Sequence, residues 1–268
     1  MTGQKEQKQW RFKDTKDSKK QYFITLFGLI IFLIAARFIS DATTWPFVWD
    51  SPAQAADFVS RMLPPDTGYL NRVLPALWDT INLAVFSTVL AAIISLPLAI
   101  MAAQNTTPHR LVRLGSLAII VTSRSVNSLI WALILVQIFG PGLFAGMLAI
   151  AIRSLGMITK LFYEAIEEIN QEPIEAMKST GATMPQVFVY GYLPQLMPSL
   201  VGVSVYRWEV NIRESAIIGL VGGGGIGFLL NSAINRLRWD QVSIVLIVIL
   251  ATVLVSEVIS SKARAAVT

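Results

Sequence analysis

Five polar or charged residues lie close together in a late stretch of the chain that is otherwise apolar. They are Arg207, Glu209, Asn211, Arg213 and Glu214. A charge near the centre of a lipid bilayer costs about 2.5–3.5 kcal/mol on insertion scales, so such side chains face one another or a watery cavity. Helical spacing places Arg207, Asn211 and Glu214 on one stripe. Glu209 and Arg213 are four residues apart on another stripe, which predicts an ion pair.

Two further arginines, Arg124 and Arg153, lie inside earlier apolar stretches. Neither has an acidic neighbour at that depth on its own helix, so we expect them to carry unbalanced positive charge. A guanidinium can hold two oxygens of an oxyanion at once. With Ser125 and Asn127 and the five residues above, these arginines are candidates for an anion pathway. Interhelical pairing or packing against carbonyls stays open for the arginines, as does a purely structural role for the Glu209–Arg213 pair.

A polar stretch rich in glutamates follows these earlier segments. Pro173 favours the first turn of a helix, and Glu175, Ala176 and Met177 come directly after Ile174. A short helix of this kind can insert into a groove on a partner protein. Small Ala176 permits close approach, Glu175 offers a charge, and Gly181 permits a sharp turn. A solvated connecting loop with a helix cap is the plainer alternative.

Four consecutive glycines, Gly222, Gly223, Gly224 and Gly225, end the late apolar stretch. A phosphate-binding loop would continue with Lys and Ser or Thr after a βαβ pattern, and neither is present. The glycines therefore allow the chain to bend and pack tightly, or they form an outer gate.

The composition indicates lipid as the solvent. Of the 268 residues, 54% are hydrophobic and 15% are charged, against about 25% charged in soluble domains. The chain has no cysteine and a single histidine, His109. Disulfides, thiolate zinc sites, cysteine nucleophiles and histidine metal clusters are thereby excluded.

A spanning helix needs roughly 20 mostly apolar residues. The sequence predicts an all-α membrane protein of about six transmembrane helices, at 21–40, 76–103, 114–139, 142–164, 197–220 and 241–260. The first is expected to be retained rather than cleaved as a signal peptide, since it is long enough to span and no clear cleavage site follows. The prolines in segment 41–75 exclude a single spanning helix there, and its tryptophans suit a membrane interface.

The distribution of Lys and Arg sets the expected orientation. Seven lysines and arginines precede the first apolar run, which places the N-terminus in the cytoplasm. The predicted organisation is a cytoplasmic basic tail at 1–20, the first transmembrane helix and an external loop at 21–75, a core domain at 76–260 with a cytoplasmic loop at 165–196, and a cytoplasmic tail at 261–268. We expect a multi-pass membrane protein with both termini in the cytoplasm.

The polar loop resembles the EAA loop of permeases from ATP-binding-cassette (ABC) importers. That loop carries Glu-Ala-Ala, then a glycine, then Leu-Pro about a dozen residues later. Glu175, Ala176, Gly181 and the pair Leu193-Pro194 match, whereas Met177 replaces the second alanine. Gly191 also departs from the pattern. The resemblance implies that Glu175, Ala176, Met177, Gly181, Leu193 and Pro194 couple the chain to an ATPase.

The charged stretch followed by Gly219-Leu220-Val221 and the glycine cluster resembles the permease family of phosphonate and phosphite importers. Arg124-Ser125-Val126-Asn127 followed by Trp131-Ala132 supports this, although Asn127 stands where the family often has proline. The resemblance implies a methionine-importer-like (type I) permease fold and transport of phosphonate, phosphite or a related phosphorus oxyanion. It also implies a homodimer in membrane lipid, two cytoplasmic ATPase subunits and an external substrate-binding protein, with no nucleic acid partner. ATP and Mg would sit on the ATPases, and this chain would carry no catalytic residue, metal or cofactor.

Two other functions remain open at the level of the sequence. The first is an ABC permease for another small solute, such as methionine. The second is a proton-coupled secondary transporter that uses Glu209 or Glu214 as the proton carrier and needs no ATPase.

Overall fold

The computed structural model describes residues 15–266, and within them every regular element is a helix. The basic tail predicted over 1–20 lies largely outside this range. The described residues fall into two units, the first ending at Ser60 and the second beginning at Arg61. The elements are α1 (Thr15–Ala42), α2 (Trp45–Met62), η1 (Thr67–Tyr69), α3 (Leu70–Ala102), α4 (Arg110–Ser125), α5 (Ser128–Phe139), α6 (Leu143–Glu167), α7 (Glu172–Ser179), α8 (Met184–Val187), the π-helical turn η2 (Phe188–Tyr192), α9 (Leu193–Gly219), α10 (Gly225–Asn235) and α11 (Trp239–Ala265).

The first unit contains α1 and most of α2. Within α1, the 24 residues Lys19–Ala42 are long and apolar enough to cross a membrane, which agrees with the predicted first helix. They bury nothing within the structure, as expected for a helix surrounded by lipid. Helix α2 has no buried residue and ends just before Leu63-Pro64-Pro65. Segment 41–75 therefore contains helix but no single span, as the prolines predicted.

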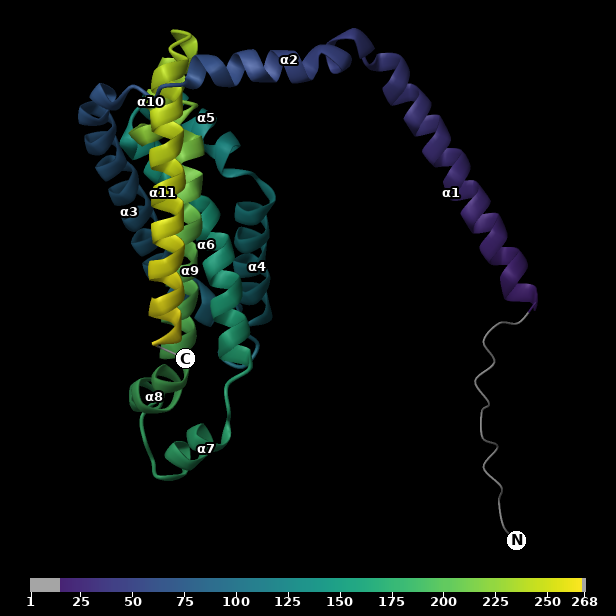
Figure 1. Cartoon of the computed structure of the whole chain (residues 1–268). Coiled ribbons are helices and arrows are strands. Elements are labelled where there is room, and N and C mark those ends of the chain that lie inside the picture. The colour runs from purple at the N-terminus through teal and green to yellow at the C-terminus, as the bar shows by residue number, and fades with distance from the viewer. Residues whose placement is uncertain (1–14, 267–268) are drawn as a thin grey trace. The chain divides into compact units, whose positions relative to one another are not determined.

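Helix α6 is the centre of the second unit and packs against α3, α4, α5 and α9 (Figure 1). Its contact with α3 uses small residues, among them Ala91 and Ala99, which are fully buried. Ser87 donates to the carbonyl of Met147 at 3.0 Å and Ser95 to that of Leu155 at 3.1 Å. Small residues let two helix backbones approach closely, and their hydroxyls hold the pair together in an apolar medium.

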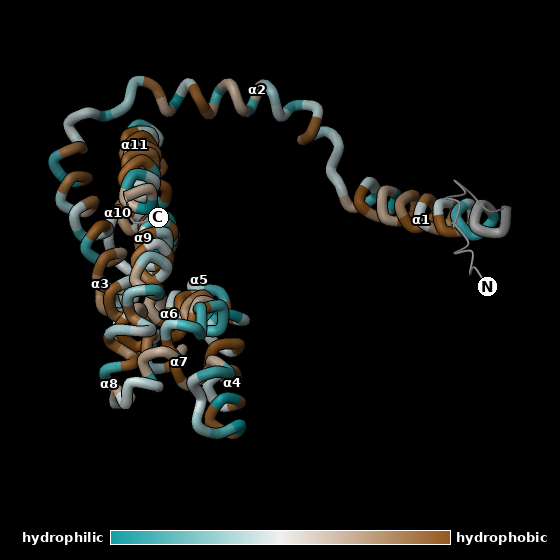
Figure 2. The backbone as a smooth tube through the Cα atoms, turned by 90° about the horizontal axis from the view of Figure 1, so that it is seen from below, coloured by the Kyte–Doolittle hydropathy of each residue, from teal (hydrophilic) through white to brown (hydrophobic). Residues whose placement is uncertain are grey.

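Within residues 15–266, four helices are long and apolar enough to span a membrane: α1, α3 with η1, α6 and α11. Most of α11 is coloured hydrophobic in Figure 2, whereas the short α8 is white to teal. Helix α9 has 27 residues, but its central charges leave it outside that group. Six spans thus remain a prediction.

The prediction of one straight helix over 114–139 is wrong. The chain bends by 92° between α4 and α5, because Val126 and Asn127 adopt extended backbone conformations. The Asn127 side chain accepts a hydrogen bond from the backbone N–H of Leu129 at 3.1 Å and so caps α5. If α4 and α5 together form one bent span, the described residues contain five candidate spans.

The segment between the predicted helices at 197–220 and 241–260 contains a further helix, α10. Its start packs against the end of α9, where a Cβ on Gly219 would lie 2.6 Å from the Cα of Gly227. The two glycines therefore allow two helix backbones to touch.

We predict that Gly219→Ala destabilises the protein by about 1–3 kcal/mol, because the added methyl group has no room. Gly202 lies on the same helix and has open space at the Cβ position, which makes Gly202→Ala the matched control. We expect that control to be neutral or stabilising by up to about 1 kcal/mol. Thermal unfolding of the detergent-purified variants measures both, and equal Tm values would contradict the close packing.

Candidate functional site

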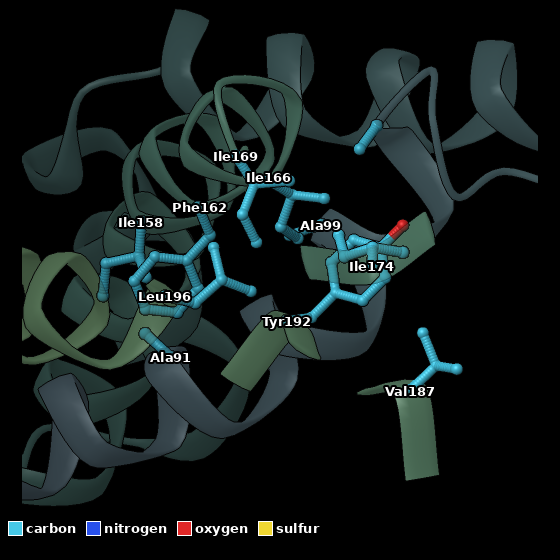
Figure 3. Packing of buried hydrophobic residues seen from close by; sticks show 11 residues of the cluster. Ala91, Ala99, Ile158, Phe162, Ile166, Ile169, Ile174, Val187, Tyr192 and Leu196 are labelled. Atoms are coloured by element: carbon cyan, nitrogen blue, oxygen red, sulfur yellow. The ribbon is translucent and has the colours of Figure 1, made fainter. Parts of the chain in front are cut away.

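Helix α7 is anchored in the core by one side chain. Ile174 is fully buried in a cluster with Ile166, Ile169, Tyr192 and other apolar residues of α3, α6 and α9 (Figure 3). Gly191 lies against this helix, since a Cβ there would be 3.5 Å from Ile174 Cγ1 and 3.4 Å from Met177 Sδ. Gly191, where the sequence departs from the EAA pattern, therefore lies where α7 packs closely on η2.

The other faces of α7 are exposed. Glu175 and Ala176 are exposed, whereas Met177 is half-buried. Gly181 follows the helix with φ of +80°, the left-handed conformation that favours glycine. The short helix predicted with Pro173 in its first turn is thus confirmed as α7, and the sharp turn follows at Gly181. Leu193 is half-buried and Pro194 exposed in the first turn of α9, so the coupling candidates divide between two helices.

Helices α7 and α8 lie at the end of the second unit where α11 finishes, and α10 lies at the other end (Figure 1). The connection before α4 is fixed at the lower end of α6. Gln104 N–H donates to Glu167 Oε1 at 2.8 Å, and Asn105 Nδ2 donates to the Ile166 carbonyl at 2.6 Å. The polar loops at 103–109 and 168–192 are therefore on one side of the bundle, as a transmembrane arrangement requires.

Three of the predicted arginines come together. Arg124 from α4, Arg153 from α6 and Arg207 from α9 line a cavity of about 300 Å³ together with Met157. Three of the four residues that line the cavity are therefore arginines, although they are far apart in the sequence.

The carboxylate of Glu214 contacts two of these arginines. Its Oε1 lies 3.3 Å from Arg153 Nε and 3.2 Å from Arg207 Nη2. The prediction that Arg153 carries unbalanced charge is therefore wrong, because the acid comes from another helix. The cavity nevertheless has three guanidinium groups, and only the Glu214 carboxylate contacts two of them among the described residues.

A hydrogen-bond chain fixes Arg207 in place. Arg207 Nε donates to Ser154 Oγ at 3.0 Å, and Ser154 Oγ donates to Asn211 Oδ1 at 2.9 Å. Asn211 Nδ2 then donates to Thr88 Oγ1 at 2.8 Å. The chain joins α9, α6 and α3, and the predicted stripe of Arg207, Asn211 and Glu214 faces it. Ser154 and Thr88 were missed because buried hydroxyls are common in helices and carry no sequence signal.

The predicted Glu209–Arg213 pair is confirmed, with Oε1 and Nη2 3.0 Å apart. Glu209 is also bound by a residue that the sequence assigned to the tail. Arg264 Nη1 lies 3.2 Å from Glu209 Oε2, and the same guanidinium stands 5.8 Å over the Tyr206 ring. Each oxygen of the buried Glu209 carboxylate thus contacts a different arginine. The ion pair between Glu209 and Arg264 links α11 to α9.

Arg124 is positioned by its neighbours Ser123 and Gly156. The Ser123 hydroxyl donates to the Ile152 carbonyl and accepts from Gly156 N–H. A Cβ on Gly156 would lie 2.8 Å from Arg124 Cγ, so only glycine allows this approach of α4 to α6. Ser125, whose hydroxyl donates to the Val121 carbonyl, and Asn127, the cap of α5, are not among the residues that line the cavity.

The glycine cluster packs closely against α3 and α6. Gly142 N–H donates to the Gly222 carbonyl at 2.9 Å. A Cβ on Gly224 would lie 2.7 Å from Leu143, and one on Gly225 would lie 2.5 Å from Thr80 Oγ1. A Cβ on Gly146 would likewise lie 2.5 Å from the carbonyl oxygen of Gly223. Close packing accounts for Gly223, Gly224 and Gly225, and a positive φ of +96° accounts for Gly222. The role of the four glycines as a gate stays a prediction.

Comparison with known proteins identifies similar transport proteins. The family model "Binding-protein-dependent transport system inner membrane component" matches residues 95–264. The phosphite transport system permease protein PtxC of Stutzerimonas stutzeri is 36% identical over 89% of this chain and 86% of its own length. The phosphate-import permease protein PhnE of Mycolicibacterium smegmatis is 37% identical over 77% of this chain and 39% of its own.

Solved structures support the fold. A chain of the inward-facing MetNI methionine ABC transporter matches with a TM-score of 0.65 at 21% identity, covering 76% of this chain and 99% of that chain. The predicted methionine-importer-like fold is therefore confirmed.

We predict that Asn211→Ala destabilises the protein by about 1–3 kcal/mol, because it breaks the chain between Ser154 and Thr88 in a fully buried position. Ser204→Ala on the same helix is the matched control, since that hydroxyl donates only within α9, to the Leu200 carbonyl. We expect the control to stay within about 0.5 kcal/mol of the parent. Thermal unfolding in detergent compares the two, and similar losses in both variants would contradict a bridging role for Asn211.

Proposed function

The chain belongs to the family of binding-protein-dependent transport system inner membrane components, and we propose that it is the permease subunit of an ATP-driven importer for phosphite, phosphonate or a related phosphorus oxyanion. The names of its relatives support this class of cargo. They include two phosphite permeases of which this chain covers more than 85% of the length.

The observation that carries the proposal is the construction of α7. The helix exposes Glu175 and Ala176 at one end of the bundle, and Ile174 roots it in the core that α3, α6 and α9 share. A partner that binds the exposed face can therefore move the helices behind it. We assign this face to a cytoplasmic ATPase subunit, with ATP and Mg held by that partner.

The arginine cavity supports an anionic cargo. A guanidinium binds phosphorus oxyanions through paired hydrogen bonds, and Arg124, Arg153 and Arg207 all line the same space. Three arginines disfavour a cationic solute. Proton coupling through Glu209 or Glu214 is also disfavoured, because both carboxylates are engaged in ion pairs with arginines.

The proposed assembly has two copies of this chain, two ATPase subunits and an external substrate-binding protein. ATP binding closes the ATPase dimer, and α7 transmits that closure to the bundle. The arginine cavity then receives the anion from the outer side and releases it inward after hydrolysis. In this scheme the chain lies in a bacterial inner membrane with both termini in the cytoplasm.

We predict that Glu175→Ala lowers substrate-stimulated ATP hydrolysis of the assembled complex about tenfold or more, because it removes a charged contact from the docking face. Gly181→Ala should act in the same direction, since φ of +80° strains a residue with a Cβ. Glu168→Ala, an exposed acid just before α7, is the matched control and should keep normal coupling. Unchanged coupling in both test variants would remove the basis for docking at α7.

The orientation gives a separate test, since the chain has no cysteine. We expect a membrane-impermeant maleimide to label Asn235→Cys, at the end of α10, from the outside of intact spheroplasts. Ser179→Cys, at the end of α7, should be labelled only in inverted vesicles, because α7 faces the ATPases. Labelling of Ser179→Cys from the outside would exclude the ATPase assignment.

A further inference from the structure

The two acids of α9 are bound in different ways. Glu209 gives one oxygen to Arg213 and the other to Arg264. Glu214 gives a single oxygen, Oε1, to both Arg153 and Arg207. Its other oxygen, Oε2, is buried without a hydrogen-bond partner among the described residues. Glu209 is thus fully satisfied, whereas Glu214 leaves half of its carboxylate unused.

The two arginines that contact Glu214 are each held by another group. Arg207 is 7% exposed, and its Nε donates to Ser154 Oγ. Arg153 Nη1 donates to the Val126 carbonyl at 3.4 Å. Both guanidiniums therefore have an anchor that does not involve Glu214. Among the residues that the structure describes, the Glu214 carboxylate is held only by these two arginines.

A phosphorus oxyanion is a better partner for this cavity than the carboxylate is. It carries several oxygens on one centre, so each of the three guanidiniums can receive its own acceptor. Arg124 lines the same cavity and would bind the anion from the α4 side. The cavity volume of about 300 Å³ leaves room for a small tetrahedral anion.

We propose that Glu214 is a displaceable counter-ion inside the permease. Without cargo its single negative charge is shared between Arg153 and Arg207. A phosphite-like oxyanion takes its place on the same guanidiniums, and the returning carboxylate then helps to expel it. The inference rests on the proposed function and adds that the chain weakens its own anion site, because tight binding would hinder release.

The test uses the whole transporter, with its ATPase subunits, in nanodiscs without ATP or the external binding protein. Equilibrium binding of radiolabelled phosphite is measured on Glu214→Gln and on the parent. Glutamine keeps the size of the side chain but removes the competing charge, so we expect binding to tighten about tenfold or more, the value of one charge-assisted hydrogen bond. With ATP and the binding protein present, phosphite uptake by the same variant should be slower, because release is impaired.

Glu209→Gln is the charge-matched control on the same helix. It removes one negative charge five positions away, at a carboxylate whose two oxygens are both paired. We expect it not to tighten phosphite binding. Equal tightening in both variants would show a general effect of net charge and would overturn the proposal.

A second variant guards against poor assembly of Glu214→Gln. Glu214→Asp keeps the charge on a shorter arm, so it should bind phosphite with an affinity between those of the parent and the glutamine variant. Unchanged or weaker binding in Glu214→Asp, or in an assembled Glu214→Gln complex, overturns the proposal. The proposed function is judged separately, since it fails if the parent complex shows neither phosphite- nor phosphonate-stimulated ATP hydrolysis.

Discussion

A charged side chain in an apolar helix bundle needs its counter-charge inside the bundle, and this constraint organises the second unit around α9. Leaving one charge at the bilayer centre costs about 2.5–3.5 kcal/mol on insertion scales, and α9 carries four charges in eight residues. Glu209 pairs with Arg213 on α9 itself and with Arg264 on α11. Glu214 pairs with Arg207 on α9 and with Arg153 on α6. Helices α6 and α11 are therefore bound to α9 by charge as well as by packing.

The close approach of the helices depends on small residues where the polar groups meet. Ser87 and Ser95 join α3 to α6 through backbone carbonyls, and Gly156 lets α4 lie against α6. Without these short distances, Arg124 would not reach the space that Arg153 and Arg207 line. Packing thus sets the position of the cavity, and charge sets its chemistry.

The sequence predicted interactions that depend on helical spacing and missed those that depend on tertiary structure. Glu209 and Arg213 follow from a separation of four residues, and α7 follows from Pro173 and the pattern after it. The pairing of Arg153 with Glu214 joins residues 61 positions apart, which spacing on one helix cannot reveal. The bend before α5 arises from an Asn127 cap inside a stretch that is apolar enough to read as one helix. Helix α10 was missed because its glycine-rich start resembles a loop.

Helix α9 connects the two parts of the site mechanically. It begins at Leu193, directly after the turn that packs on α7, and carries Arg207 about 21 Å further along at 1.5 Å per residue. A continuous helix transmits a displacement of one end to the other with little loss, because its backbone hydrogen bonds resist local deformation. Arg207 is tied to α6 and α3 through Ser154 and Asn211, so a shift of α9 relative to these helices changes the spacing of the arginines. The cavity that collects positive charge is therefore also the place where motion of α7 would alter the affinity for an anion.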